Sequence, residues 1–289
     1  MAQIGTTIED LFVVEHAFLN CCYGAFIDRE SRVTIVSTSS YAEKGTGWFA
    51  YYLALFGNFN FISKDVEVDV DDQDPFYNLN PEPRHDMKTL KGLNKEERTN
   101  KKLVEKLTLK QAYRDAYFND LYECCKDRQD AWFIVIKEHK TNDPDDKKIY
   151  LTANKKDGSL MMINDADFYN TLCQDFAKLM EAEEHLGVVT LSDLYSLKDS
   201  YAINLMKKKH ADVSCNSFVM RPASDLMNSA NKLIVAHRIA RFLSAKLDNG
   251  RDMRPVDEQE LSEEGFGFRE DKNFEKSKKE AEDKAKKMV

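Results

Sequence analysis

Two stretches of this chain contain residue types that could hold a phosphate or a cation, but neither has the spacing that such sites need. Gly45-Thr46-Gly47 could bring backbone N–H groups near a phosphate, yet it lacks the Lys and the hydroxyl partner of a P-loop. The aspartates at 69, 71, 72 and 74 could gather a hard cation, but an EF-hand loop needs Gly and Glu where this chain has Asp74 and Asn80. We interpret both stretches as loops and expect no cofactor.

The six cysteines and six histidines show no metal-ligand or catalytic spacing. No C-x-x-C occurs, no His lies at zinc-finger distance from a Cys, and H-E-x-x-H and G-x-S-x-G are missing from the sequence. Cys21 and Cys22 are adjacent, and neighbours on a strand point to opposite faces, so one metal would not easily hold both. We expect buried reduced thiols, no metal site and no catalytic residue. A triad assembled only in three dimensions stays open.

The strongest binding signal is basic and helical. Arg238 and Arg241 are three residues apart on a predicted long helix, so they share one face. That face could meet phosphates or the acidic residues of a partner, and residues 207–209 add a second cluster of three lysines. The alternative interpretation is a solvated helix face.

The C-terminal part of the sequence, from Arg251 onward, is charged and poor in apolar residues. Phe266, Phe268 and Phe274 interrupt it, and a Lys/Glu-rich helix is predicted over residues 273–288. Burying one Phe is worth roughly 1.5–3 kcal/mol, so a few of them can hold a segment that buries little else. We therefore expect these three residues to bind another protein subunit, either a second copy or a different chain.

A nucleic-acid site is the alternative. Trp132 and Tyr150 could stack on the bases of a single strand, beside three lysines that would meet its phosphates. These lysines are Lys137, Lys155 and Lys156. Aromatic residues in strands belong more often to the core, so this interpretation ranks second.

The elements that would position these residues predict an α+β fold. Residues 131–137, 149–152 and 160–163 form apolar runs separated by turn residues, which indicates an antiparallel β-meander. Asp165 or Asp167 is expected to cap the helix that follows it. Further strands are expected near residues 18–27, 32–37, 59–62, 66–70 and 213–220, and helices over 48–56, 108–126, 192–209 and 222–247.

The expected fold class is therefore α+β, with antiparallel β-meanders packed against several helices and a charged helical C-terminal tail. The Pro-containing stretch before residue 86 is the best candidate for a boundary. We predict an N-terminal α+β region over 1–86, a central β-meander and helical region over 87–250, and a C-terminal tail or arm over 251–289.

Composition limits the class of protein further. The chain has 289 residues, 42% of them hydrophobic, and a net charge of −8, which argues against broad adhesion to nucleic acid or anionic membranes. The N-terminal residues do not resemble a signal peptide, and no run approaches the length of a membrane span. We expect a cytoplasmic protein without membrane partners, and we include an infected host cell and a virion among its locations.

The sequence favours a non-enzymatic structural or assembly subunit of a larger complex, with viral and phage complexes among the candidates. The alternative is a single-stranded nucleic-acid-binding protein with an OB-like sheet. An enzyme is the third and least favoured class, since no catalytic motif stands out in the sequence.

Overall fold

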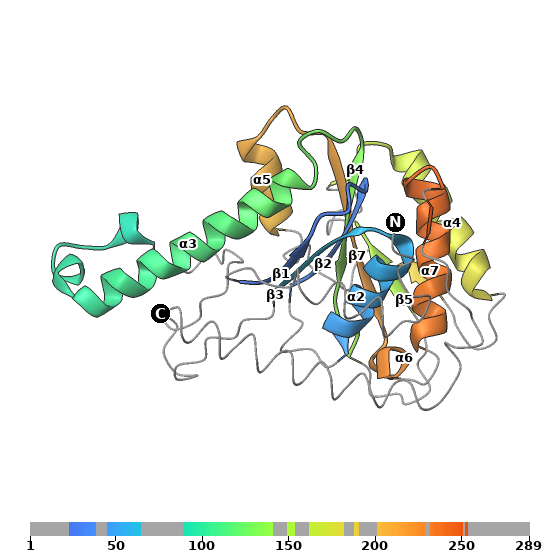
Figure 1. The fold of residues 1–289 in the computed structure, drawn as a ribbon, viewed down its shortest axis with the longest axis horizontal. Coiled ribbons are helices and arrows are strands. Elements are labelled where there is room, and N and C mark those ends of the chain that lie inside the picture. Colours follow the sequence, from blue (N-terminus) through green and yellow to red (C-terminus); the bar gives the residue numbers. More distant parts are fainter. Residues whose placement is uncertain are drawn as a thin grey trace, which may run out of the picture.

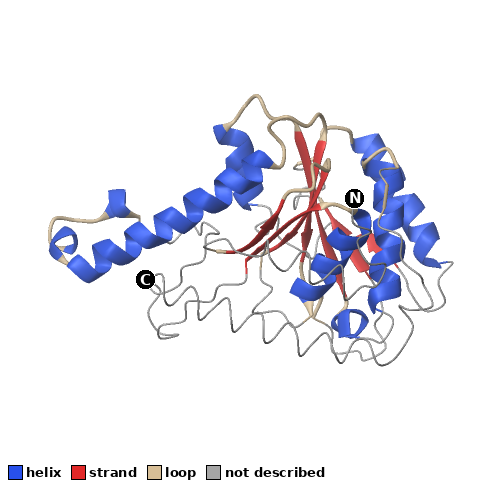
Figure 2. Cartoon of the chain, in the orientation of Figure 1, coloured by secondary structure: helices blue, strands red, loops and turns tan. Residues whose placement is uncertain are grey.

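A computed structural model describes residues 23–38, 45–64, 89–140, 149–153, 162–181, 188–190, 201–228, 232–250 and 252–253. These residues contain a mixed β-sheet with helices on both of its faces, so the chain is an α+β protein (Figures 1 and 2). The strand predicted over 66–70 lies outside the described residues.

The sheet has seven strands and a parallel centre. The strands are β1 (Gly24–Ile27), β2 (Val33–Ser37), β3 (Asn60–Lys64), β4 (Ala131–Ile136), β5 (Ile149–Thr152), β6 (Val188–Thr190) and β7 (Cys215–Pro222). Their order across the sheet is β1-β3-β2-β4-β7-β5-β6. The four middle strands, from β3 to β7, run parallel to one another. β1 is antiparallel to β3, and β5 is antiparallel to β7 and parallel to β6.

The antiparallel meander expected over residues 131–163 is wrong. β4 and β5 do not pair with each other, because β7 lies between them, parallel to β4 and antiparallel to β5. Every residue of β4 is buried, and a strand that is buried on both faces belongs in the parallel centre of a sheet. Met162 and Ile163 do not lie in a strand. An open sheet with a parallel centre also differs from the Greek-key barrel of an OB-fold.

The helices form a layer on each face of the sheet (Figures 1 and 2). They are α2 (Thr46–Gly57), α3 (Lys101–Glu123), α4 (Ala166–Glu181), α5 (Tyr201–Lys209), α6 (Ser224–Asn228) and α7 (Lys232–Leu247), with short 3₁₀ turns η1 (Leu90–Gly92) and η2 (Glu97–Thr99). Residues of α2, α4 and α7 share one hydrophobic core with the first face of the sheet. Residues of α3 and α5 share a second core with the opposite face.

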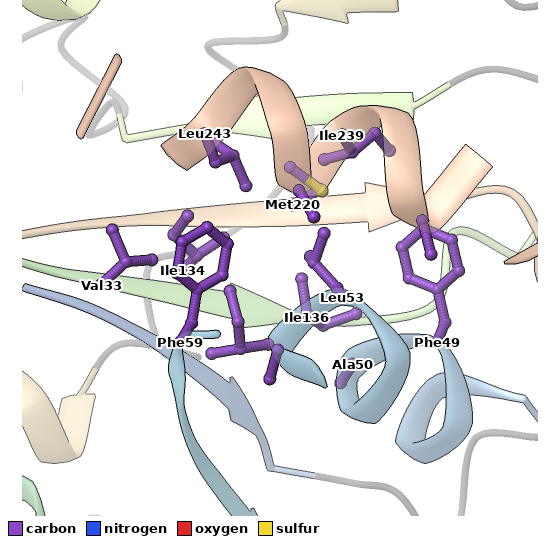
Figure 3. Packing of buried hydrophobic residues seen from close by; sticks show 14 of the residues in the cluster. Val33, Phe49, Ala50, Leu53, Phe59, Ile134, Ile136, Met220, Ile239 and Leu243 are labelled. Atoms are coloured by element: carbon purple, nitrogen blue, oxygen red, sulfur yellow. The ribbon is translucent and has the colours of Figure 1, made fainter. Parts of the chain in front are cut away.

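The helix predicted over residues 48–56 is confirmed as α2, and it is buried. All of its residues except Trp48 are buried, as expected for a helix that is apolar around its whole circumference. Leu53 and Ala50 of α2 point into a cluster that includes Ile136 and Met220 from the sheet and Ile239 from α7 (Figure 3). α2 is therefore the central helix of the first core.

Helix starts follow the capping residues more closely than the apolar pattern. α3 begins at Lys101, earlier than the predicted residue 108, because Asn100 Oδ1 accepts a hydrogen bond from Leu103 N at 3.2 Å. Asp165 is confirmed as a cap, since its Oδ1 accepts from Phe168 N at 2.9 Å.

The prediction that Pro222 opens a long helix is wrong. Pro222 is the last residue of β7 and pairs with Ile149, and the long helix α7 begins only at Lys232. Proline has no N–H for the ladder, but its carbonyl oxygen accepts a hydrogen bond from His139 N at 2.9 Å. The end of β7 is therefore held to the segment that follows β4.

The boundary predicted near residue 86 falls between β3 and α3. Strands on its two sides pair in one sheet, since β2 lies beside β4 over five residue pairs from Val33↔Trp132 to Ser37↔Ile136. Of the predicted tail over 251–289, only Asp252 and Met253 are described. Among the helices that the structure describes, none is both long and apolar enough to cross a membrane.

Candidate functional site

The carboxyl edge of the parallel strands is the candidate functional site. After β2 the chain passes through α2 to β3, which is the neighbour of β2 on one side in the sheet. After β3 it passes through α3 to β4, which is the neighbour of β2 on the other side. The two crossover helices pack on opposite faces of the sheet. The direction of winding thus reverses between β2 and β4. In open α/β sheets, ligands bind outside the carboxyl ends of the strands at this kind of switch point.

Three basic residues and a threonine follow one another across this edge. Ser63, Ser37, Ile136 and Met220 pair in register on β3, β2, β4 and β7. The next residue along each strand is basic on three strands and a threonine on the fourth. We call this set the cationic row, and it consists of Lys64, Thr38, Lys137 and Arg221.

The cationic row lies on the face of the sheet that α3 and α5 partly cover. Side chains alternate along a strand, and the residues two places earlier belong to the second core. These residues are Ile62, Val36, Val135 and Val219. Lys137 and Arg221 lie on adjacent strands, and Lys64 and Lys137 lie on the two strands that flank Thr38. Neighbouring strands are roughly 4.8 Å apart.

Most of the cationic row is buried. The exposed fractions are 2% for Lys64, 3% for Thr38 and 9% for Lys137. Each of the three basic residues has a contact partner within the protein, and Arg221 Nη1 donates a hydrogen bond to Glu138 O at 3.3 Å. By contrast, the buried hydroxyl groups of Thr38 and Ser37 have no hydrogen-bond partner among the described residues. Buried hydroxyls normally have one, so these two deserve an explanation.

The N-terminus of α2 begins at the same edge of the sheet. Gly45 is its N-cap residue, with φ 85° and ψ −17°, and no side chain caps the helix. Thr46 and Gly47 belong to the helix rather than to the loop that we expected, and Thr46 Oγ1 lies 3.8 Å from Met227 Sδ. The partial positive charge of a helix N-terminus therefore lies at this edge, on the side of the sheet opposite the cationic row.

The segments that follow β4 and β7 are bound to each other beside the row. Ser224 Oγ donates a hydrogen bond to Glu138 Oε1 at 2.7 Å, and the rings of His139 and Tyr150 lie 4.1 Å apart between centroids. His139 also bridges to Ala223 in parallel register. This edge is therefore built by contacts between strands that are far apart in the sequence.

The two aromatic residues predicted to bind nucleic acid are buried. Trp132 is 6% exposed and packs on Phe168 and Phe218, and Tyr150 is 9% exposed. Their predicted role in stacking stays a prediction. Lys137 belongs to the cationic row, and Lys155 and Lys156 lie outside the described residues.

The residues predicted to bind a protein partner are only partly described. Arg238 and Arg241 lie on α7. Arg241 is exposed, Arg238 is half-buried, and the preceding residue His237 is buried. The anchors Phe266, Phe268 and Phe274 lie outside the described residues. The predicted role of these five residues stays a prediction.

The cysteines that the structure describes are buried and form no disulfide with one another: Cys124, Cys125, Cys173 and Cys215. No group of three or more His, Cys, Asp or Glu side chains is placed to hold a metal ion in the described part of the chain. Burial raises the pKa of the Cys124 thiol to about 12 and that of Cys215 to about 11. Cys21 and Cys22 lie outside the described residues.

These raised pKa values predict a loss of stability in alkali. In the unfolded chain the two thiols ionise near their ordinary pKa of about 9, whereas in the folded chain they ionise only at higher pH. Ionisation therefore favours the unfolded state, and the fold loses stability as the pH rises from about 9 towards 12. We expect the unfolding temperature of the wild type to fall more steeply above pH 9 than that of Cys124→Ala/Cys215→Ala. Iodoacetamide should leave both thiols unlabelled near pH 8 until urea unfolds the chain, as read by mass spectrometry of peptides. Rapid labelling of the folded protein would contradict this.

The sequence contains a signal for the cationic row that we did not use. A predicted strand ends in or next to a basic residue three times, at Lys64, Lys137 and Arg221, but only the strand order shows that these residues lie on nearby strands. Together with the buried hydroxyl of Thr38, the row can attract and hold an anion. Comparisons with known proteins add no assignment: no family model, no curated protein and no solved structure matches this chain.

Proposed function

We propose that this chain binds an anionic ligand that carries phosphate groups, at the carboxyl edge of the sheet between β2 and β4. The observation that carries the proposal is the cationic row: three basic residues at the ends of neighbouring parallel strands, largely buried, at the switch point. Like charges on neighbouring strands repel one another. A bound anion would relieve that repulsion.

The polar groups around the cationic row support a phosphate-bearing ligand rather than an apolar one. Lys and Arg donate charge-assisted hydrogen bonds to phosphate, and the hydroxyl of Thr38 is a further donor on the same face of the sheet. The basic residues already have partners in the protein, so the ligand would join these contacts or exchange with them. The proposed role is binding rather than catalysis, as expected from the sequence.

Titration of the purified full-length chain with inorganic pyrophosphate tests this proposal. We expect pyrophosphate to raise the unfolding temperature above that in sodium chloride of the same ionic strength, because a ligand that binds only the folded state stabilises it. Lys137→Met should weaken binding at least tenfold by calorimetry, and Thr38→Val by about tenfold, since a hydrogen bond to a charged group contributes roughly 1.5 kcal/mol or more.

Lys178→Met is the matched control, because the Lys178 side chain is 75% exposed on α4, outside the cationic row. It should bind pyrophosphate as the wild type does. The proposal fails if pyrophosphate gives no shift, or if Lys178→Met and Lys137→Met weaken binding equally. It also fails if Lys137→Met loses stability while its pyrophosphate affinity is unchanged, since Lys137 would then only pair with a group of its own chain.

A subunit of a larger assembly, the role expected from the sequence, is the second candidate. The specific observation that favours it is the projection formed by η1, η2 and the first part of α3, which stands away from the sheet (Figure 1). We call residues 89–112 the arm. Most of its residues are exposed or half-buried, which suits contact with a partner.

A further inference from the structure

We propose that the arm binds the phosphate backbone of double-stranded nucleic acid, independently of the site on the sheet. Its tip, residues 91–102, contains five basic and two acidic residues, whereas the whole chain has a net charge of −8. All five basic side chains of the tip are exposed: Lys91, Lys95, Arg98, Lys101 and Lys102. Exposed Lys and Arg residues on an otherwise acidic protein indicate a surface that meets a polyanion.

The tip is an ordered structure rather than a charged loop. Asn94 and Glu97 form a reciprocal capping box, with Asn94 N donating to Glu97 Oε2 at 3.0 Å and Glu97 N donating to Asn94 Oδ1 at 2.8 Å. Arg98 Nε donates to Leu93 O at 3.1 Å, and Leu93 is only 5% exposed. These contacts fix the chain direction, so the basic side chains leave from defined positions.

Two of the basic residues occupy positions that cost helix stability. Lys101 and Lys102 lie in the first turn of α3, which contains no acidic residue. Cations at a helix N-terminus face the positive end of the macrodipole, and each such placement is unfavourable by roughly 0.3–1 kcal/mol. A phosphate bound at this end would interact favourably both with the two lysines and with the positive end of the helix dipole.

The arm holds its tip away from the second core. Tyr117 is the first residue of α3 in the second core, where its ring meets Tyr23 at 5.1 Å between centroids. From Lys101 to Tyr117 a helix rises about 24 Å. This exceeds the Debye length of about 8 Å at physiological ionic strength, so charges near Tyr117 act only weakly on the tip.

The composition of the arm favours a duplex over a single strand. Residues 89–112 contain no Phe, Tyr or Trp, and single-strand binding relies on aromatic side chains for stacking. Contacts to phosphates carry no sequence information by themselves. The partner is therefore a nucleic-acid duplex that is held without sequence preference.

Fluorescence anisotropy with a labelled 20-base-pair DNA duplex tests the inference on the full-length chain. We expect binding that weakens steeply between 50 and 200 mM salt, because bound phosphates release counterions. Lys95→Gln/Lys101→Gln/Lys102→Gln should weaken binding at least tenfold at 100 mM salt and reduce the slope of log K against log salt by roughly 2–3. The duplex should bind more tightly than either of its single strands.

The matched control is Lys126→Gln/Lys178→Gln/Lys209→Gln, which removes the same charge from exposed positions outside the arm. It should keep most of the affinity and the slope. Equal losses in both triple variants would overturn the inference, as would tighter binding of single strands. Sedimentation of the protein alone completes the test. If the protein self-associates, loses this self-association only in the triple variant of the arm, and does not bind the duplex, then the partner of the arm is a second copy of the chain and the inference is overturned.

Discussion

Replacing Asn60 with Leu should lower the free energy of unfolding by at least about 3 kcal/mol. The Asn60 side chain is fully buried and makes four hydrogen bonds. Its Oδ1 accepts from Arg29 N at 2.9 Å and Ser31 N at 3.1 Å, and its Nδ2 donates to Ser31 O at 2.7 Å and Thr34 Oγ1 at 3.1 Å. Leu has a similar volume, so the loss comes from polar groups left without partners rather than from a cavity.

The effect is large because Asn60 fixes the turn that leads into the central strand β2. The same turn is held by Asp248, the residue that follows α7. Its Oδ2 accepts a hydrogen bond from Ser31 Oγ at 2.6 Å, and its Oδ1 accepts one from Arg32 N at 3.3 Å. β2 carries Thr38 directly after its last residue. A disturbed turn would therefore shift the strand around which the cationic row is arranged.

Urea unfolding of Asn60→Leu, Asn60→Asp and the exposed control Asn94→Leu measures this effect. Asn94→Leu removes a cap and should cost only about 1 kcal/mol. Asn60→Asp keeps the acceptor but places a carboxylate against Ser31 O, so its folded pKa is raised and stability returns as the pH falls and the group is protonated. Its deficit should shrink below pH 7, while that of Asn60→Leu should not. If Asn60→Leu lowers the free energy of unfolding no more than Asn94→Leu does, the four hydrogen bonds of Asn60 stabilise the fold no more than an exposed cap does.

The buried elements of the fold could be predicted from local patterns, and their pairing could not. The apolar run 131–136 identifies β4, and the apolar stretch 48–56 identifies α2. The turn residues over 141–146 favoured a hairpin between β4 and β5, yet β7 occupies that position from about 70 residues later in the chain. The unbroken burial of β4 was the physical signal, because a meander strand with one solvent face would alternate.

The candidate site was hidden for the same reason. Lys64, Lys137 and Arg221 are single basic residues in three distant parts of the sequence. They become neighbours only through parallel pairing in register across four strands. The stretch Gly45-Thr46-Gly47 suggests phosphate binding by its residue types, but it lacks the P-loop spacing, so the sequence predicts a loop there. Its position at the N-terminus of α2 depends on where β2 ends, which the spacing alone does not specify.

Adding a single methyl group at Gly57 should be almost as damaging as removing a core ring. A Cβ at this position would overlap the ring of Phe59, which is fully buried in the first core and points into the cluster with Val33 and Ile134 (Figure 3). The backbone around it is fixed by the end of α2, where Asn58 has φ 53° and Phe59 N donates to Ala54 O at 2.8 Å. We expect Gly57→Ala to lower the free energy of unfolding by about 3 kcal/mol, the upper range for overpacking.

A double-mutant cycle separates this overlap from other effects of the substitution. Phe59→Ala alone should cost about 3–5 kcal/mol through the cavity it leaves. In Gly57→Ala/Phe59→Ala the ring is gone, so the new methyl group meets no obstacle and the combined loss should fall short of the sum of the single losses by roughly 1–3 kcal/mol.

Gly92→Ala is the matched control, because a Cβ there would meet only Thr89 Oγ1, at 3.7 Å, and its cost should stay within about 0.5 kcal/mol. Urea unfolding of the four chains of the cycle and of the control gives these values. If Gly57→Ala lowers the free energy of unfolding as little as Gly92→Ala does, the end of α2 can move away from Phe59. In that case α2 is not held rigidly against β3, and the prediction is wrong.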